Sequence, residues 1–319
     1  MPEQIIKVIK QHRTFLITSH IRPDGDALGS ELALYGVLKD LGKEALVYNR
    51  DQTPDNYRFL PGSDSIVHEL SAAEKYEVVF ILDCSDLERI GDRAVLIGGM
   101  PLIVNIDHHV SNPGFSPLAL IDREASSTGE ILYRLFRQMD VSISRDVANN
   151  LYAAIMTDTG GFRYRNTKSE TLHAAGYLVE RGADPQWLSE NIYENTPPAK
   201  IRLMAEALDT LTFSLEGKAA DIVVSLASLA AAGARSEHVE GLVDIPRTIR
   251  GVVVSMLYLE LEEGHYKLSL RSQGNTNVEQ VARHFGGGGH TNAAACKIKG
   301  SLESIKGQVA AALRKVVTL

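Results

Sequence analysis

The sequence predicts an α/β protein of two domains: an N-terminal domain with a mainly parallel sheet flanked by helices, and a smaller C-terminal α/β domain with a mixed sheet. Three observations predict it. From residue 14 to about residue 160, short apolar runs alternate with helical patterns, which is typical of βαβ units. Two adjacent prolines, Pro197 and Pro198, then interrupt the pattern. With 319 residues, the chain has the length of two ordinary domains.

Local patterns justify the N-terminal elements in order. A first helix is expected from apolar residues at helical spacing: Ile5, Ile6, Val8 and Ile9. Four buried strands are expected at Thr14–Thr18, Ala45–Tyr48, Val78–Leu82 and Leu102–Ile106. A second helix begins near Ala27 and ends at Gly42. Another follows a capping-box pattern, in which Ser127 and Glu130 can satisfy each other's free amides.

The C-terminal elements follow a linker that we place at residues 191–205, between domains of residues 1–190 and 206–319. A helix is expected from about Lys200 to Leu211. Strand-like stretches follow at Asp221–Ser225, Val252–Leu261 and Tyr266–Leu270, and the last two form a hairpin. A final helix runs from about Leu302 to Val317.

Composition excludes several classes of protein. The 44% hydrophobic and 23% charged residues are those of a globular chain, not a disordered one. The net charge of −7 disfavours a protein that coats long duplex nucleic acid. Cys84 and Cys296 stand far apart, which excludes a disulfide framework or a thiolate zinc site. No apolar run approaches the ~18 residues that a membrane span needs. We therefore expect a soluble cytoplasmic protein without membrane contacts.

The strongest local motif is His20-x-x-x-Asp24-x-Asp26, directly after an apolar strand and before a helix. Ligands usually bind at this end of the strands in open α/β sheets. Taken alone, the segment is equally well explained by a turn at Asp24 and a helix cap at Asp26.

Similar groups recur after other buried segments. Asp83 follows VVFIL, Asp107-His108-His109 follows LIVNI, and Asp158 ends the stretch LYAAIMT. These groups would meet at one sheet edge if the segments are parallel, adjacent strands. Carboxylates gathered there would repel one another, and divalent cations are the usual remedy. The recurrence therefore predicts a metal centre.

The types of candidate ligand narrow the choice of metal ion. Carboxylates and imidazoles without thiolates are too oxygen-rich for structural zinc, and the histidines make a pure magnesium or calcium site less natural. Manganese fits such a mixture. Because the candidate ligands exceed what one ion needs, we expect a dinuclear site of the kind used for displacement at phosphorus.

Two features of the second domain suit an anion. Arg271, in SLRS, can bind a phosphate or carboxylate through paired hydrogen bonds from its planar guanidinium group. The run Gly286–His290 brings backbone amides close to a ligand. A flexible linker is the alternative for this run, but patterned segments on both sides favour a binding loop.

The motifs HIRPDGDALGS, ILDCSD, IDHH, TDTGGF, SLRS and GGGGH together resemble the DHH phosphoesterase superfamily with its DHH-associated C-terminal domain. Within it, the chain resembles the compact subfamily of nano-RNases and pAp phosphatases. The motifs run from His20 to Cys296 in that family's order and spacing. The stretch Thr291–Cys296 departs from the family pattern, in which a glycine commonly stands near Ala295.

The resemblance implies a role for each matching residue. One Mn²⁺ would be held by His20, Asp24 and Asp83. The other would be held by Asp26, Asp83, His108 and Asp158, with Asp83 bridging the ions. Two residues are implied as catalytic groups: Asp107, orienting the ligands, and His109, facing the scissile phosphate. The implied substrate-binding residues of the second domain are Arg271, Gly287, Gly288, Gly289 and His290.

The resemblance also implies an activity. It is a Mn²⁺-dependent phosphodiesterase and phosphatase, with Mg²⁺ or Co²⁺ as substitutes, whose catalytic cleft lies between the domains. Its substrates would be short oligoribonucleotides, linear dinucleotides such as pApA, and 3′-phosphoadenosine 5′-phosphate (pAp). A homodimer is implied as well.

Other activities stay open at this point. They are cleavage of cyclic dinucleotides, an inorganic pyrophosphatase, and a nucleotide sensor without turnover. SLRS with GGGGH argues against the pyrophosphatase, whose C-terminal domain differs, and the complete ligand set argues against the sensor.

Overall fold

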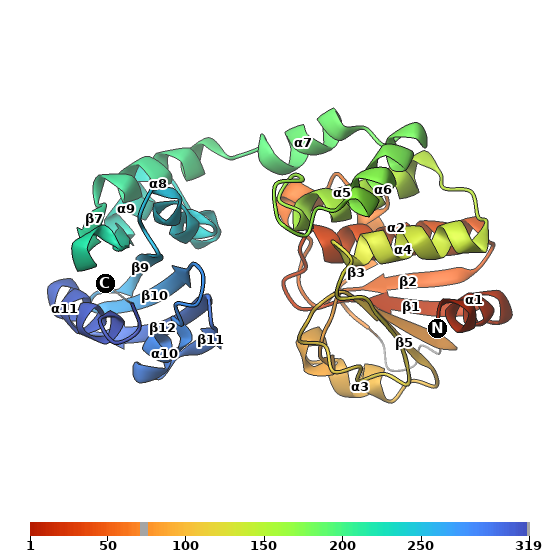
Figure 1. Cartoon of the computed structure of the whole chain (residues 1–319), viewed down its shortest axis with the longest axis horizontal. Coiled ribbons are helices and arrows are strands. Elements are labelled where there is room, and N and C mark those ends of the chain that lie inside the picture. Colours follow the sequence, from red (N-terminus) through yellow and green to blue (C-terminus); the bar gives the residue numbers. More distant parts are fainter. Residues whose placement is uncertain (71–75, 318–319) are drawn as a thin grey trace. The chain divides into compact units, whose positions relative to one another are not determined.

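The structure of the chain, a computed structural model, describes residues 1–70 and 76–317 (Figure 1). It divides into two units, Met1–Asn195 and Thr196–Leu319, and each has a sheet and hydrophobic cores of its own. The first sheet is parallel and the second is mixed. The predicted α/β fold is confirmed.

The first unit is built on a six-stranded sheet whose neighbouring strands all run parallel. The strands are β1 (Thr14–Thr18), β2 (Glu44–Tyr48), β3 (Ile66–Val67), β4 (Val78–Leu82), β5 (Ile103–Asp107) and β6 (Leu118–Ile121). Their order is β3-β2-β1-β4-β5-β6. The chain thus adds β2 and β3 on one side of β1, returns to place β4 on its other side, and then adds β5 and β6 beyond β4. The switch point, where open sheets bind ligands, lies between the carboxyl ends of these two strands.

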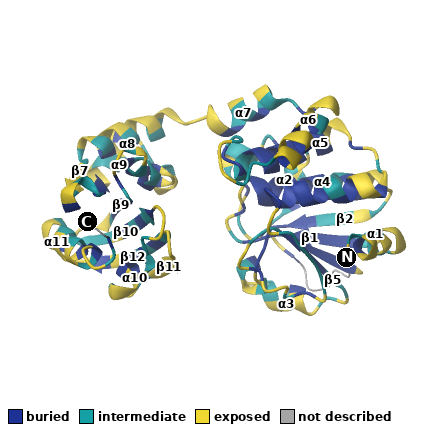
Figure 2. Ribbon diagram, in the orientation of Figure 1, coloured by how far each residue is buried: buried dark blue, intermediate teal, exposed yellow. Residues whose placement is uncertain are grey.

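Helices cover both faces of this sheet (Figure 1). They are α1 (Pro2–Gln11), α2 (Gly25–Asp40), α3 (Ala94–Gly98), α4 (Thr128–Met139), α5 (Arg145–Asp158), α6 (Ser169–Glu180) and α7 (Pro185–Tyr193). The main core joins one face of the sheet to α1, α2, α4 and α5. A smaller core packs α3 on the other face. Figure 2 shows α2 as buried along most of its length.

Small residues let α2, α4 and α5 approach closely. A Cβ atom added at Gly29 would lie 2.4 Å from the carbonyl oxygen of Asn150. One added at Gly129 would lie 2.5 Å from the Cβ of Ala154. Both distances are shorter than van der Waals contact, so only glycine fits at these two positions. The contact brings the start of α2, the start of α4 and the end of α5 together.

Three N-terminal elements differ from the sequence prediction. The strands β3 and β6 were not predicted, because β3 has two residues and β6 consists of half-buried residues without alternation. The run LYAAIMT, expected as a strand of the sheet, belongs to the helix α5. This helix is buried among its neighbours along nearly its whole length, so its apolar residues show no clear helical period.

The second unit contains a mixed six-stranded sheet of order β11-β12-β10-β9-β8-β7. The strands are β7 (Thr212–Ser214), β8 (Ala219–Val224), β9 (Val254–Glu262), β10 (His265–Ser272), β11 (Gly288–His290) and β12 (Ala293–Lys299). The strands β8 and β9 are parallel and the other pairs are antiparallel. The predicted hairpin corresponds to β9 and β10.

Four helices accompany this sheet: α8 (Pro198–Asp209), α9 (Leu226–Ala232), α10 (Glu279–His284) and α11 (Leu302–Leu313). One core lies between the sheet and the helices α10 and α11, and a second joins β8 and β9 to α8 and α9. The break between the units falls at Asn195 and Thr196. Within the predicted linker 191–205, only residues 194–197 lie outside helices.

Candidate metal centre

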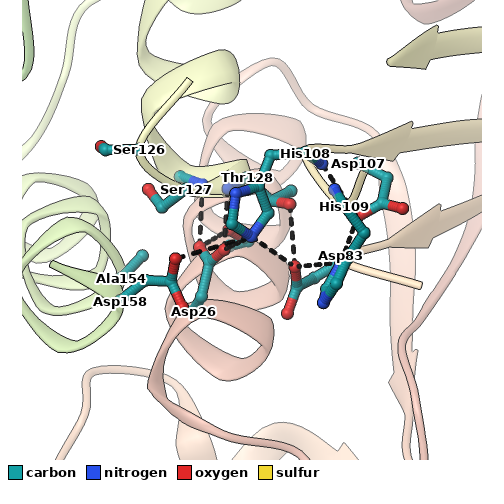
Figure 3. Close-up of polar contacts among 12 residues, drawn as sticks. Asp26, Asp83, Asp107, His108, His109, Ser126, Ser127, Thr128, Ala154 and Asp158 are labelled. Carbon is teal, nitrogen blue, oxygen red and sulfur yellow. Dashed lines mark hydrogen bonds and ion pairs between the residues drawn. The ribbon is translucent and has the colours of Figure 1, made fainter. Parts of the chain in front are cut away.

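Acidic and histidine side chains gather at the switch point of the first sheet. His20 follows β1, Asp83 follows β4, and Asp107 ends β5 with His108 and His109 directly after it. These groups come from the carboxyl ends of three adjacent parallel strands, as predicted from the sequence. Further carboxylates come from the helices above the sheet (Figure 3).

His108 lies at the middle of the cluster. Its Nε2 atom is 3.6 Å from Asp26 Oδ2, 3.5 Å from Asp83 Oδ1 and 3.6 Å from Asp158 Oδ2. Each distance is too long for a good hydrogen bond. Ligands bound to one ion at ~2.1 Å are, by simple geometry, roughly 3 to 3.5 Å apart. The spacing therefore suits donors that surround a cation.

Asp83 faces two groups of donors at once. Its Oδ2 lies 3.5 Å from His20 Nε2, and its Oδ1 lies 3.5 Å from Nε2 of His108. Ligand atoms of His20, Asp24 and Asp83 lie close enough to hold one ion, and those of Asp26, His108 and Asp158 could hold another. Asp83 is thus positioned to contribute an oxygen to each of two adjacent sites.

The buried carboxylate of Asp26 is held at the start of α4. The backbone amides of Thr128 and Gly129 donate to its two oxygens, at 2.7 and 2.9 Å. The Ser30 hydroxyl donates to Oδ1. Positively polarised amides at a helix N-terminus attract anions, so this contact fixes the position of Asp26.

Asp158 reaches the cluster from a helix, which corrects its predicted place at the end of a sheet strand. It is the last residue of α5, and the backbone after it turns through Gly160 and Gly161 at positive φ. A carboxylate at a helix C-terminus is disfavoured by the helix dipole. A bound cation would remove this repulsion.

Asp107 orients His109 and the backbone that carries it. Its Oδ1 accepts from the backbone amides of His108 and His109 and lies 2.7 Å from His109 Nδ1. Its Oδ2 accepts a hydrogen bond from the Asn112 amide. With Nδ1 donating to Asp107, the Nε2 atom of His109 is left for another partner.

Burial and charge move the pKa values in opposite directions within the cluster. Burial raises the pKa of Asp158 to about 6 and raises that of Asp26 well above its usual value, with Asp83 adding repulsion to both. Burial also opposes ionisation of Asp83, but the hydrogen bond from His20 and the charges of His109 and His108 outweigh it and lower its pKa to about 2. The Asp107 hydrogen bond raises the pKa of His109 to about 9.

The carboxylate and imidazole groups of the cluster fit a divalent metal ion. Several carboxylates and imidazoles converge without a lysine or arginine partner among the ion pairs of the described residues. Three of the carboxylates, those of Asp24, Asp26 and Asp158, have pKa values raised by burial and by repulsion from Asp83, so the protein alone does not compensate their charges. Oxygen and imidazole donors of this kind suit Mn²⁺ and related ions.

In the second unit, the predicted anion-binding residues lie at one end of the sheet. Arg271, on β10, is about one-third exposed and lies 3.9 Å from an oxygen of Asp244. The glycine run was expected to form a binding loop, but part of it is a strand, which corrects that expectation. The amides of Gly286 and Gly287 bond to the last turn of α10, and Gly288–His290 forms the edge strand β11. His290 is exposed on this strand and lies opposite Ala293.

The comparisons with known proteins agree with this arrangement. The DHH family N-terminal domain matches residues 14–155, and the DHHA1 domain matches residues 221–318. A Thermus thermophilus protein named bifunctional oligoribonuclease and PAP phosphatase NrnA is 33% identical over 306 residues, 95% of this chain and 90% of that protein. The chain belongs to the DHH family. The resemblance read from its motifs is confirmed.

Two other proteins match over nearly the whole chain. A Streptococcus mutans protein, named probable bifunctional oligoribonuclease and PAP phosphatase NrnA, is 30% identical over 90% of each chain. The crystal structure of an exopolyphosphatase-related protein from Bacteroides fragilis superposes with a TM-score of 0.91 at 29% identity. It covers 98% of this chain and 95% of that one.

Three supporting residues of this DHH centre were not singled out from the sequence. Thr128 Oγ1 donates to Asp83 Oδ1, Asn112 holds Asp107, and the Asn166 amide donates to the backbone carbonyl of Asp158. Only Thr128 carried a signal, because it stands in the predicted capping box. In that box Ser127 accepts from the amide of Glu130, but the Glu130 carboxylate bonds to Ser126 instead of Ser127.

The raised pKa values predict how pH acts on the metal-free protein. Asp26, Asp158 and His109 all have pKa values above those of the unfolded chain, so the folded state binds more protons between about pH 4 and pH 9. Its stability must therefore fall as pH rises through this window. We expect the melting temperature of EDTA-treated protein to decrease from pH 5.5 to pH 8.5.

The control is Asp26→Asn, which removes one of these carboxyl groups and keeps its shape. Its melting temperature should depend less on pH than that of the parent. A metal-free protein that becomes more stable with rising pH would contradict the assignment.

No helix among the described residues is long and apolar enough to span a bilayer.

Proposed function

We propose that the chain is a Mn²⁺-dependent phosphoesterase that hydrolyses short oligoribonucleotides and linear dinucleotides to mononucleotides, and pAp to AMP. The observation that supports it most is Asp83, whose two oxygens face two adjacent sets of donors. Paired metal sites that share a carboxylate suit displacement at phosphorus. Oligoribonuclease and PAP phosphatase are the activities in the names of the Thermus thermophilus and Streptococcus mutans relatives.

The residues that would hold the metal fall into two sets that share Asp83. His20 and Asp24 complete the first set, and Asp26, His108 and Asp158 complete the second. Two divalent ions held there would activate water for in-line attack and neutralise the charge that develops on the phosphoryl group. The amides at the start of α4 keep Asp26 in place when substrate enters.

His109 has a separate task in this proposal. Its Nδ1 donates to Asp107, and the resulting pKa of about 9 keeps the ring protonated at neutral pH. The Nε2–H group can then donate to an oxygen of the scissile phosphate, as its exposed face allows. Asp107 acts through His109 as a positioning residue.

Anchoring of the rest of the substrate is assigned to the second unit. Arg271 would grip a phosphate away from the reacting centre, and Gly287, Gly288, Gly289 and His290 would border the bound nucleotide. A planar guanidinium binds phosphate in a bidentate manner. The edge strand β11 also leaves one row of its backbone groups without a strand partner.

A length series tests this function. Purified protein with Mn²⁺ is incubated with pAp, pApA, cyclic di-AMP and oligoribonucleotides of increasing length, and initial rates are measured at fixed ionic strength. We expect oligomers of two to five residues to be cleaved faster than chains of about twenty, because an enclosed site buries most of its ligand.

The other outcomes are equally informative. Rates that rise steadily with length would favour a processive exonuclease and contradict the proposal. Turnover of cyclic di-AMP above that of pApA would assign the chain to cyclic dinucleotides. Loss of all rates on chelation, with recovery on adding Mn²⁺, is expected for every true substrate.

A further inference from the structure

Two lysines stand directly opposite each other on the sheet of the second unit. Lys267, on β10, pairs with Lys297, on β12, in the antiparallel register. Directly opposite residues point to the same face of a sheet, so their Cβ atoms are about 5 Å apart. Both side chains are exposed.

Among the described residues, α8 and α9 cover this face of the sheet at β8 and β9 but not at the exposed lysine pair. Lys267 also lies opposite Leu259 of β9, which belongs to the core under α8 and α9. That core takes its sheet residues from β8 and β9. On β10 and β12 the same face continues with the half-buried Ser269 and Ala295. The lysine pair therefore stands on an open part of the sheet.

The charge of the pair is not compensated within the protein. Among the described residues, neither Lys267 nor Lys297 has a carboxylate within ion-pair distance, whereas Lys306 and Arg271 of the same unit both do. Like charges directly opposite each other destabilise a sheet. Two neighbouring positive charges without an internal partner raise the local concentration of anions at this point of the surface.

The surface at this point is hollowed. A cavity of about 340 Å³ is lined by Lys267, Gly286, Gly287, Ala295, Cys296 and Lys297. Gly287 cannot carry a side chain, because an added Cβ would lie 2.2 Å from the carbonyl oxygen of Ala295. The small residues keep the space between the lysines and the glycine run open.

We propose that Lys267 and Lys297 form a second anion site, which binds a backbone phosphate of an oligonucleotide beyond the group held by Arg271. Arg271 is four residues further along β10 on the same face, roughly 13 Å away at the usual rise of a strand. The lysine pair thus adds a separate point of attachment that a substrate as short as pAp does not use. The inference rests on the proposed function of the chain.

The test is the double variant Lys267→Gln/Lys297→Gln. Its affinity for a fluorescein-labelled phosphorothioate 5-mer, which resists hydrolysis, is measured by anisotropy with Mn²⁺ present. We expect the Kd to rise about tenfold, as for loss of one charge-assisted contact. The slope of log K against log salt should become shallower by about 0.7, the value for one phosphate of a single strand. Hydrolysis of pAp should stay within twofold of the parent.

A control variant, Lys7→Gln/Lys10→Gln, removes two exposed lysines of α1 and should leave the 5-mer affinity unchanged. The melting temperature of the lysine-pair variant should equal or exceed that of the parent, because a like-charge contact is relieved. Equal effects of both double variants, or an unchanged salt slope, would overturn the inference. A parent protein that binds the 5-mer but hydrolyses neither pAp nor pApA would instead contradict the proposed function.

Discussion

Replacing Asp83 by asparagine should reduce the rate of phosphoester hydrolysis by on the order of 10³ or more, because this one substitution removes a charged ligand from both proposed metal sites. Its two oxygens face His20 on one side and His108 on the other. Asparagine keeps the shape of the side chain but removes its charge. It also tolerates the positive φ of 51° at this position, where alanine would add backbone strain.

Elemental analysis separates the causes of that loss. The Asp83→Asn protein should retain less than two manganese ions per chain and remain folded by circular dichroism. Asp92→Ala, which removes an exposed carboxylate outside the centre, serves as the matched control and should keep both metal and rate. A variant with two ions and near-normal turnover would show that Asp83 is not shared.

Replacing Arg271 by alanine should raise the KM for pAp about 30-fold, the equivalent of ~2 kcal/mol for a lost phosphate contact on a partly exposed arginine. The rate on bis-p-nitrophenyl phosphate, which lacks a second phosphate, should change little. Arg271→Lys keeps the charge without the planar fork and should restore part of the affinity.

The control for Arg271 lies in the same unit. Arg283 is an exposed residue of α10, paired with Glu279, and its replacement by alanine should leave both substrates unaffected. If Arg271→Ala slows both substrates equally, the residue supports the fold of the second unit rather than binding a distal phosphate. Its proximity to Asp244 makes this comparison necessary.

The strand-end part of the centre could be predicted from sequence because chain order and sheet order coincide there. His20, Asp83 and Asp107 each follow a continuous apolar run, and parallel strands deliver their carboxyl ends to one edge. Asp26 and Asp158 were also named as candidate ligands, but the helix that carries Asp158 could not be predicted. Asp158 was associated with a strand because a fully buried helix and a buried strand both read as continuous apolar runs.

The glycine run shows a different limit of sequence reasoning. Glycine indicates that side chains are not tolerated, but not which neighbour excludes them. In the structure, a side chain at Gly287 would collide with the carbonyl oxygen of Ala295 on the adjacent strand. A side chain at Gly289 would collide with the carbonyl oxygen of Ala293. The hairpin pairing of β11 with β12 therefore produces a glycine pattern that the sequence analysis assigned to a loop.

The candidate ligands of the metal centre come from two layers of the first unit, the sheet and the closely packed helices α2 and α5. His20, Asp83 and His108 are carried by the sheet, whereas Asp26 and Asp158 are carried by two helices whose contact passes through Gly29 and Ala154. The spacing between the Asp26 and Asp158 carboxylates thus depends on how deeply one helix sits in the groove of the other. A change in the volume of Ala154 would alter this spacing while every candidate ligand stays the same.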